Sequence, residues 1–264
     1  MALLAVPGPF DFTLTTERFR AFGVDRASLW HEGGLHRVVG GRELRIEAAD
    51  GGVEVEPLDG RTEPVVRAVL GLPFELEPFY AWAAEDEILA PIVPRLIGFR
   101  PSLAPDPFEM LVGAITSQQV SLFSALAIRN RMIERFGDQA GVAWAFPTRE
   151  RLAAAREEEL VAVGFSWRKA EYVVGLARAD IDLDALATLP DDEVRTRLVA
   201  VRGIGEWTAE WFLARHLARP HAWPAGDLAL RKAVAPLDVA VGRVRFHPFE
   251  NLSAHYLLLS NRVP

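Results

Sequence analysis

Two features of the chain have clear chemical potential: a glycine-bearing turn at 203–205 and a carboxylate further along, Asp227. An amphipathic run from 191 to 200 ends before the turn, and a second apolar run begins at Trp207. This pattern predicts two helices joined by a tight hairpin. Gly203 and Gly205 can both take positive φ and leave room for another backbone. The first amides of the second helix point outward without intrahelical acceptors and, with the helix dipole, form a site for a phosphate oxygen.

Asp227 follows a Trp-Pro-Ala-Gly segment at 223–226 and precedes a predicted helix at 228–234. The segment predicts a rigid, partly apolar approach to the carboxylate. Aspartate is a preferred N-cap, so its side chain is expected to accept hydrogen bonds from the first N–H groups of the helix. Taken alone, Asp227 is most simply a cap. Only its pairing with the upstream hairpin indicates a chemical role.

The hairpin, the Gly/Pro-containing loop and the aspartate together resemble the helix-hairpin-helix (HhH-GPD) DNA glycosylases, and within them the AlkA-like 3-methyladenine DNA glycosylase II group. A lone Gly-Ile-Gly would be a weak signal. Here the likeness extends over nearly the whole chain, because several further segments follow the order of that family. These segments are residues 10–14, 107–109, 117–121, Gly164 with 169–172, 203–205 and 227–231.

The resemblance implies base excision repair by hydrolysis of the N-glycosidic bond of alkylated bases, of the 3-methyladenine and 7-methylguanine type. Asp227 would stabilise an oxocarbenium-like sugar and position water. Trp207 stands where strand-cleaving members carry a Schiff-base lysine, which implies a monofunctional enzyme. Trp207 and Trp211 would line the base pocket, where stacking on a cationic purine gains about 1–2 kcal/mol. Tryptophans at this spacing are also typical of helix core.

The resemblance assigns base flipping to the loop at 117–121, with Gln119 as the wedge and Gln118 lining the pocket. The best-known members carry leucine at the wedge position. A polar wedge can hydrogen-bond the orphaned base but inserts less apolar surface. The simpler alternative is that two glutamines end a helix at a solvated turn. The hairpin residues expected at the phosphate are Arg202, Gly203, Ile204, Gly205 and Thr208.

No cofactor is expected for catalysis. In this family the hairpin can hold a monovalent cation, Na⁺ or K⁺, here on the backbone carbonyls of Val199, Val201 and Ile204. The six histidines have no metal-binding spacing. The lack of cysteine excludes disulfides, thiolate nucleophiles, cysteine-bound zinc and the iron–sulfur cluster of the endonuclease III branch.

The segment after Asp227 departs from the family pattern, since it passes quickly to Phe246–Phe249 and has Glu250 where arginine is expected. The pocket wall on that side is therefore not predicted by the resemblance. His247 and His255 are candidate donors to the pocket, although an isolated histidine is more often a surface or hydrogen-bonded residue.

The net charge of −7 argues against a protein that coats DNA, because Lys and Arg supply most non-specific affinity. From Ala200 onward, eight basic residues face five acidic ones, so a DNA-binding face is expected at the C-terminal end. The apolar start at 1–6 lacks a basic region and breaks at Pro7, and no apolar run approaches ~20 residues. We expect a cytoplasmic protein, a monomer without membrane segments, whose partner is double-stranded DNA containing damaged bases.

The expected fold class is α+β. Residues 1–76 are predicted to form an antiparallel module like half of a TATA-binding-protein domain, and residues 77–264 a helical HhH-GPD body with a cleft between its halves. The module has alternating strands at 35–39, 43–47 and 52–56 and helices at 15–21 and 63–70. In the body, Asp106 with Glu109 predicts a capping box. Further caps are predicted at Thr148, Ser166 and Asp182.

Two other functions remain open. One is a helix-hairpin-helix glycosylase for another lesion, such as hypoxanthine, uracil or an oxidised purine. The other is a non-catalytic helix-hairpin-helix DNA-binding module. The Gly-Asp-Leu context of Asp227 favours an enzyme.

Overall fold

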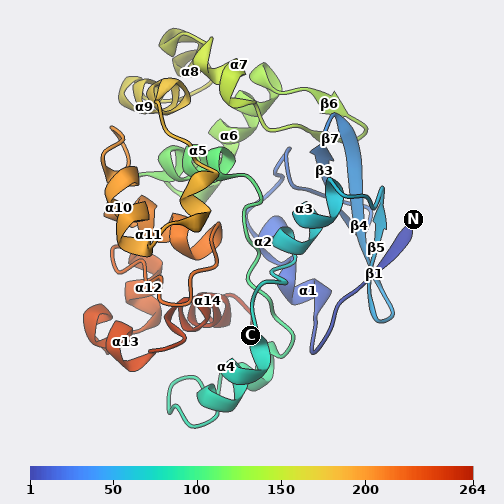
Figure 1. The fold of residues 1–264 in the computed structure, drawn as a ribbon, viewed down its shortest axis with the longest axis vertical. Coiled ribbons are helices and arrows are strands. Elements are labelled where there is room, and N and C mark those ends of the chain that lie inside the picture. The colour runs from blue at the N-terminus through green and yellow to red at the C-terminus, as the bar shows by residue number, and fades with distance from the viewer. Residues whose placement is uncertain (264) are drawn as a thin grey trace.

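A five-stranded antiparallel sheet with the order β1-β5-β4-β3-β2 forms one flank of the molecule (Figure 1). The computed structural model describes residues 1–263. Leu44 and Ile46 lie on the buried side of the sheet, as the period-two alternation predicts. The strands are β1 (Ala2–Ala5), β2 (Leu29–His31), β3 (Gly34–Val39), β4 (Arg42–Ala49) and β5 (Gly52–Glu56).

The edge strands β1 and β2 are too short for an alternation signal. The apolar start of the chain becomes β1, in which Leu4 pairs with Val53 of β5. The predicted helix at 15–21 is wrong in outline, because it is split into α1 (Phe12–Thr15) and α2 (Arg18–Ala21). Asp11 caps α1 one turn earlier than expected, with Leu14 N donating to its Oδ1 at 2.8 Å.

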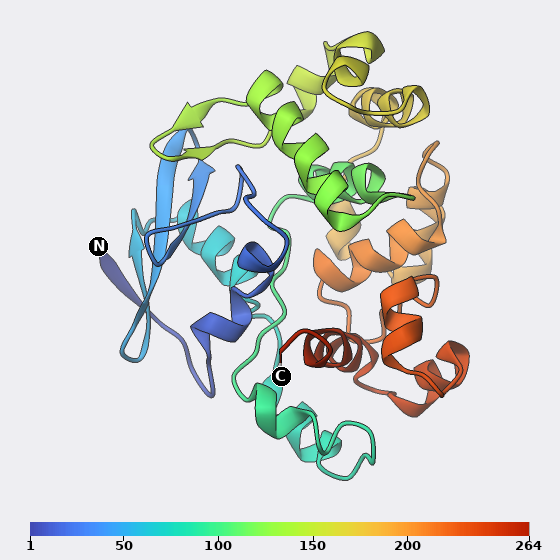
Figure 2. The ribbon, with the colours of Figure 1, turned by 180° about the vertical axis from the view of Figure 1, so that it is seen from behind.

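The rest of the chain is mostly helical, and most of its helices lie on the other side of α1, α2 and α3 (Thr62–Val69) from the sheet (Figures 1 and 2). No helix in residues 1–263 is long and apolar enough to cross a membrane. The helices after α3 are α4 (Leu76–Ala83), η1 (Val93–Leu96), α5 (Pro107–Ser117), α6 (Leu122–Phe136), α7 (Arg149–Ala153), α8 (Glu157–Ala162), α9 (Trp167–Arg178), η2 (Ala185–Thr188), α10 (Asp191–Val199), α11 (Glu206–Arg215), α12 (Leu228–Ala233), α13 (Val239–Arg245) and α14 (Glu250–Ser260). A small hairpin of β6 (Gln139–Ala140) and β7 (Ala143–Trp144) follows α6.

Most predicted caps are confirmed. Asp106, Thr148 and Ser166 each accept a hydrogen bond from the third residue of their helices. Asp182 accepts one from Ala185 at the start of η2. The capping box at Asp106 is wrong, because the Glu109 side chain turns away from the cap and binds two arginines.

The buried apolar residues form three clusters. One lies between the sheet and its helices, and contains Leu35, Ile46 and Val66. A second lies under helices α5 to α11. The third joins α4 and η1 to α12, α13 and α14. The helical body thus has two cores, and the polypeptide crosses between them before α5 and again after α11. The proposed boundary at residue 76 stays a prediction.

A buried ionic network connects the sheet to the helical body. Glu109 of α5 accepts from Arg37 of β3 and from Arg129 of α6, each at 2.6 Å. Arg37 also contacts Ser28, and Arg129 pairs with Asp25. Burial alone would raise the pKa of Glu109, but the two guanidinium groups lower it below its ordinary value. The carboxylate therefore remains charged and holds the two parts of the fold in register.

We predict that Glu109→Ala lowers the free energy of unfolding by about 3–5 kcal/mol, because it leaves two buried guanidinium groups without a carboxylate. Glu63→Ala, which removes an exposed pair with Arg67, should cost less than ~1 kcal/mol. Because the pKa of Glu109 is lowered on folding, its contribution should be fully present above the ordinary carboxylate pKa and lost progressively as pH falls through the lower pKa of the folded protein. Urea unfolding at pH 7 and pH 4 measures both effects. Equal losses for the two variants would contradict the role of the network.

Candidate DNA-binding and catalytic site

The predicted hairpin lies between α10 and α11. Ile204 is buried, and its N–H donates to the Val201 carbonyl at 3.0 Å. Gly203 has a φ of +95°, and a Cβ there would lie 2.3 Å from the ring of Tyr172. Gly205 differs from the expectation, because its φ of −112° is open to any residue and a Cβ there would meet nothing within 4 Å. Gly203 is therefore needed by the fold, whereas Gly205 keeps the outer surface of the hairpin open.

The amino end of α11 faces outward from this turn. Gly205 is the N-cap and accepts from Thr208 N at 2.9 Å, while the N–H groups of Glu206 and Trp207 belong to the first turn and have no intrahelical acceptor. Thr208 is 1% exposed. Its amide and side chain are thus withdrawn from the surface, contrary to its predicted place at the phosphate.

Arg202 is exposed at the hairpin and pairs with Glu171 of α9 at 2.9 Å. Its guanidinium lies 5.7 Å from the centre of the Tyr172 ring. Arg202 therefore lies on the outer side of this turn, and Tyr172 packs against its inner side.

Gln118 and Gln119 end α5 beside the hairpin. Gln118 Nε2 donates to the Gly203 carbonyl at 3.0 Å, so the side chain supports the hairpin. This contact differs from the expectation that Gln118 lines the base pocket. Gln119 is exposed and has a φ of +55°, a left-handed conformation that is uncommon for a side chain of this size. Lys169 Nζ donates to the Thr116 carbonyl at 2.8 Å and so holds the end of α5 from the other side.

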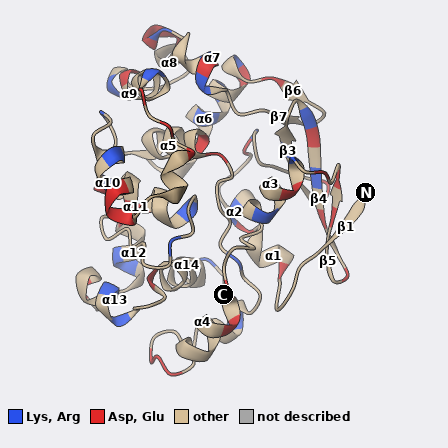
Figure 3. Cartoon of the chain, viewed as in Figure 1, with Lys and Arg blue, Asp and Glu red and all other residues tan. Residues whose placement is uncertain are grey.

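The basic residues after Ala200 differ in their ion pairing. Arg202, Arg219, Arg245 and Arg262 pair with acidic side chains. Figure 3 shows basic residues on α12 and α13. Within residues 1–263, the exposed Arg231, Lys232 and Arg243 of these helices make no ion pair. The local positive charge free for a polyanion is therefore small.

Asp227 lies at the amino end of α12 and accepts four hydrogen bonds. Its Oδ1 accepts from the backbone N–H groups of Ala229 and Leu230 at 2.9 and 3.0 Å, which confirms the predicted cap. Its Oδ2 accepts from the indole Nε1 of Trp207 and of Trp211, both at 3.1 Å. The carboxylate is half-buried. The two indoles orient Oδ2 toward α11.

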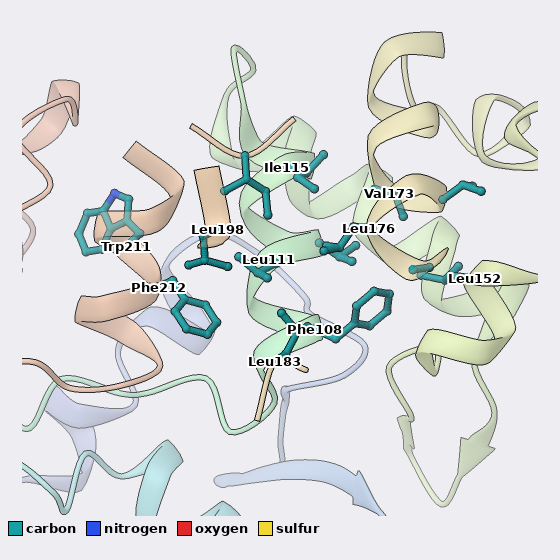
Figure 4. Packing of buried hydrophobic residues seen from close by; sticks show 14 of the residues in the cluster. Phe108, Leu111, Ile115, Leu152, Val173, Leu176, Leu183, Leu198, Trp211 and Phe212 are labelled. Carbon is teal, nitrogen blue, oxygen red and sulfur yellow. The ribbon is translucent and has the colours of Figure 1, made fainter. Parts of the chain in front are cut away.

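The two tryptophans therefore have a role that their spacing did not reveal. Trp211 is 4% exposed at the edge of the cluster that contains Phe212 (Figure 4). The Arg215 guanidinium lies 4.1 Å from its ring centre, so one face of Trp211 is covered by an internal cation. Trp207 is half-buried, and a Cβ on Gly226 would lie 3.5 Å from its ring. Trp207 is thus the better placed of the two to stack on a base.

A group of positive charges lies near Asp227. The pKa of Arg215 is lowered to about 9, because burial and the nearby Arg18 outweigh the opposite effect of Asp227. Burial, together with Arg215 and Arg18, lowers the pKa of His255 well below its ordinary value. His255 lies 5.8 Å from Trp211, ring centre to ring centre, and its Nε2 has no hydrogen-bond partner in the described part of the chain. His255 is therefore a neutral imidazole beside the carboxylate site at pH 7.

His247, the other histidine considered for the pocket, lies with Glu250 and His221. Its Nδ1 is 3.2 Å from Glu250 Oε1. Phe246 and Phe249, in the segment that departs from the family pattern, pack into the third core cluster. This segment thus supports α14, and α14 brings His255 to the site.

Residues 112–244, half of the chain, match the family model described as HhH-GPD superfamily base excision DNA repair protein. A DNA-3-methyladenine glycosylase of Bacillus subtilis is 32% identical over 164 residues, which cover 59% of this chain and 54% of that protein. The chain spans about half the length of the first curated relatives it matches.

Two solved structures extend the likeness. A 3-methyladenine DNA glycosylase from Archaeoglobus fulgidus has a TM-score of 0.89 and 28% identity, covering 99% of each chain. The Schizosaccharomyces pombe glycosylase Mag1, solved with abasic DNA, has a TM-score of 0.57 and 28% identity over 67% of this chain and 92% of that one. The family model, the hairpin and the aspartate at the end of the following loop agree with one another. The chain belongs to the HhH-GPD superfamily of base excision DNA repair proteins.

Proposed function

We propose that this protein is a monofunctional DNA glycosylase that hydrolyses the N-glycosidic bond of alkylated bases. The observation that carries the proposal is the half-buried Asp227 carboxylate, held by two indole and two backbone donors near the hairpin at 203–205. Departure of the base leaves positive charge on the sugar, and a fixed carboxylate stabilises that charge without reorganising. The B. subtilis and A. fulgidus relatives named as 3-methyladenine glycosylases support this substrate class.

The proposed reaction begins with the damaged nucleotide turned out of the helix, since its glycosidic bond is out of reach in the stack. Gln119, exposed in a left-handed conformation at the end of α5, is suited to fill the space left by the base. The hairpin amides and a monovalent cation on the carbonyls of Val199, Val201 and Ile204 would hold one phosphate. Trp207 would stack on the base. Asp227 would stabilise the sugar cation, and water would add to it to leave an abasic site. The Mag1 structure with abasic DNA supports DNA as the partner.

A second candidate is excision of a neutral lesion with carbonyl or ring-nitrogen acceptors, such as hypoxanthine. Arg215 covers one face of Trp211. Arg18 lies close enough to Arg215 to lower the pKa of the Arg215 guanidinium. Guanidinium groups donate hydrogen bonds to acceptors and repel a cationic purine. Neutral His255 beside them offers a further donor or acceptor.

We predict that Asp227→Asn reduces base release roughly 10²–10³-fold, because one preorganised electrostatic contact with the transition state is lost. Asparagine remains a good N-cap, so the fold should be retained. The measurement is single-turnover release from duplexes containing 3-methyladenine, 7-methylguanine, hypoxanthine, uracil or an oxidised purine, which also ranks the two candidates. Asp238→Asn is the matched control, since Asp238 caps α13 in the same way. Excision by Asp227→Asn at the rate of the control would contradict the mechanism.

We predict that borohydride traps no covalent enzyme–DNA adduct during turnover, and that the product strand breaks only after alkali or heat. The chain has only two lysines. Lys169 Nζ is bound to the Thr116 carbonyl, and Lys232 is exposed on α12 near Asp227. A trapped adduct that disappears in Lys232→Ala would show that this amine attacks the sugar.

We predict that DNA affinity depends weakly on salt, because three unpaired cations on α12 and α13 flank a grip made mainly of backbone amides. The slope of log affinity against log salt should be near −3. Gly205→Val should weaken binding to damaged and undamaged duplexes alike, since the protein has room for the side chain but a DNA backbone does not. Gly60→Val is the control, at another open position without positive φ. A slope steeper than about −6, or an effect on damaged DNA alone, would contradict the hairpin as the main DNA-binding surface.

A further inference from the structure

Three potential metal ligands meet on the outer side of the third core cluster. They are His221, from the loop after α11, His247, from the segment after α13, and Glu250, at the start of α14. One ligand atom from each lies within 4.8 Å of the other two. The residues are separated in sequence by up to 29 positions, which is why no motif spacing indicated them.

Glu250 makes this cluster unusual. It is 4% exposed, and its ionic partners among residues 1–263 are the two imidazoles, with no lysine or arginine beside it. A buried carboxylate needs compensating positive charge or full hydrogen bonding. His221 and His247 are exposed, so the carboxylate is reached from solvent between two imidazole rings.

The geometry suits a small divalent ion. His221 Nδ1 lies 3.0 Å from Glu250 Oε2, and His247 Nδ1 lies 3.2 Å from Oε1. Two tetrahedral zinc bonds place their ligand atoms about 3.4 Å apart. The rings of His221 and His247 stack with their centres 5.0 Å apart at 21°, so both present the same edge to the carboxylate. Two imidazoles and one carboxylate are a donor set that Zn²⁺ accepts, with water completing its coordination.

We propose that His221, His247 and Glu250 form a divalent metal site, with Zn²⁺ as the ion that best fits the ligands. The site would join the loop that leads to Asp227 to the helix that carries His255. That connection already includes two hydrogen bonds from Asn251 to backbone carbonyls. Its N–H donates to the Pro220 carbonyl at 2.9 Å, and its side-chain Nδ2 donates to the Arg219 carbonyl at 3.0 Å. The ion adds a cross-link on the solvent side and acts on stability. It does not take part in base release.

The test uses the full chain after treatment with a chelator and removal of that chelator. Titration with Zn²⁺ alone, followed by calorimetry, should give one ion per chain. Zn²⁺ at a hundredfold excess over its Kd should raise the thermal midpoint by roughly 5–10 °C. The rate of base release should be unchanged by the chelator, which keeps this test independent of the proposed glycosylase activity.

Single variants decide the ligands. His221→Ala and His247→Ala remove exposed side chains, so both should fold, and each should weaken Zn²⁺ binding at least ~10-fold. Glu250→Gln should weaken it as strongly. His31→Ala is the matched control, a half-exposed histidine beside an acidic residue outside the cluster, and should bind as the parent does. Binding that survives in His221→Ala with His247→Ala combined, or no binding by the parent chain, would overturn the proposal.

Discussion

The fixed position of the Asp227 carboxylate is the constraint on which the candidate site depends. One oxygen is held by the amino end of α12, and the other by two indoles of α11. The two helices meet at the boundary between two hydrophobic cores, since Trp211 belongs to one and Leu230 to the other. Both cores must therefore be packed correctly for both oxygens to be satisfied. The geometry at Asp227 therefore depends on how the two halves of the helical body are placed relative to each other.

The hairpin at 203–205 and the end of α5 are likewise bound to each other. Gln118 joins them through the Gly203 carbonyl, and Tyr172 of α9 packs where a Cβ on Gly203 would stand. Lys169, also of α9, holds the last turn of α5. Under the proposed function, the phosphate grip and the wedge act as one rigid unit. A nucleotide held at the hairpin is then presented to Gln119 at a constant distance, and the DNA deforms more than the protein.

Local signals predicted much of this structure. The central strands, the caps at Asp106 and Asp227 and the turn at Gly203 each depend on residues within about four positions, where period and backbone conformation act directly. The indole bonds to Asp227 bridge 16 and 20 positions, and Gln118 reaches Gly203 across 85. Such contacts depend on how helices cross, which composition and period do not encode. Glu109 shows the limit clearly, because the same glutamate fits a capping box in sequence and an ion pair with β3 in the fold.

The acidic charge of the protein is compatible with DNA binding because of how its cations are distributed. Many arginines pair with acidic side chains and serve the fold, as Arg37 and Arg129 do at Glu109. Others are internal to the candidate site, where Arg215 stacks on Trp211. Under the proposed function, backbone N–H groups at the amino end of α11 would supply much of the grip on a phosphate, beside the exposed and unpaired cations of α12 and α13. Such groups point in one direction and require a nearby surface free of side chains, which is the arrangement that Gly205 provides at the hairpin.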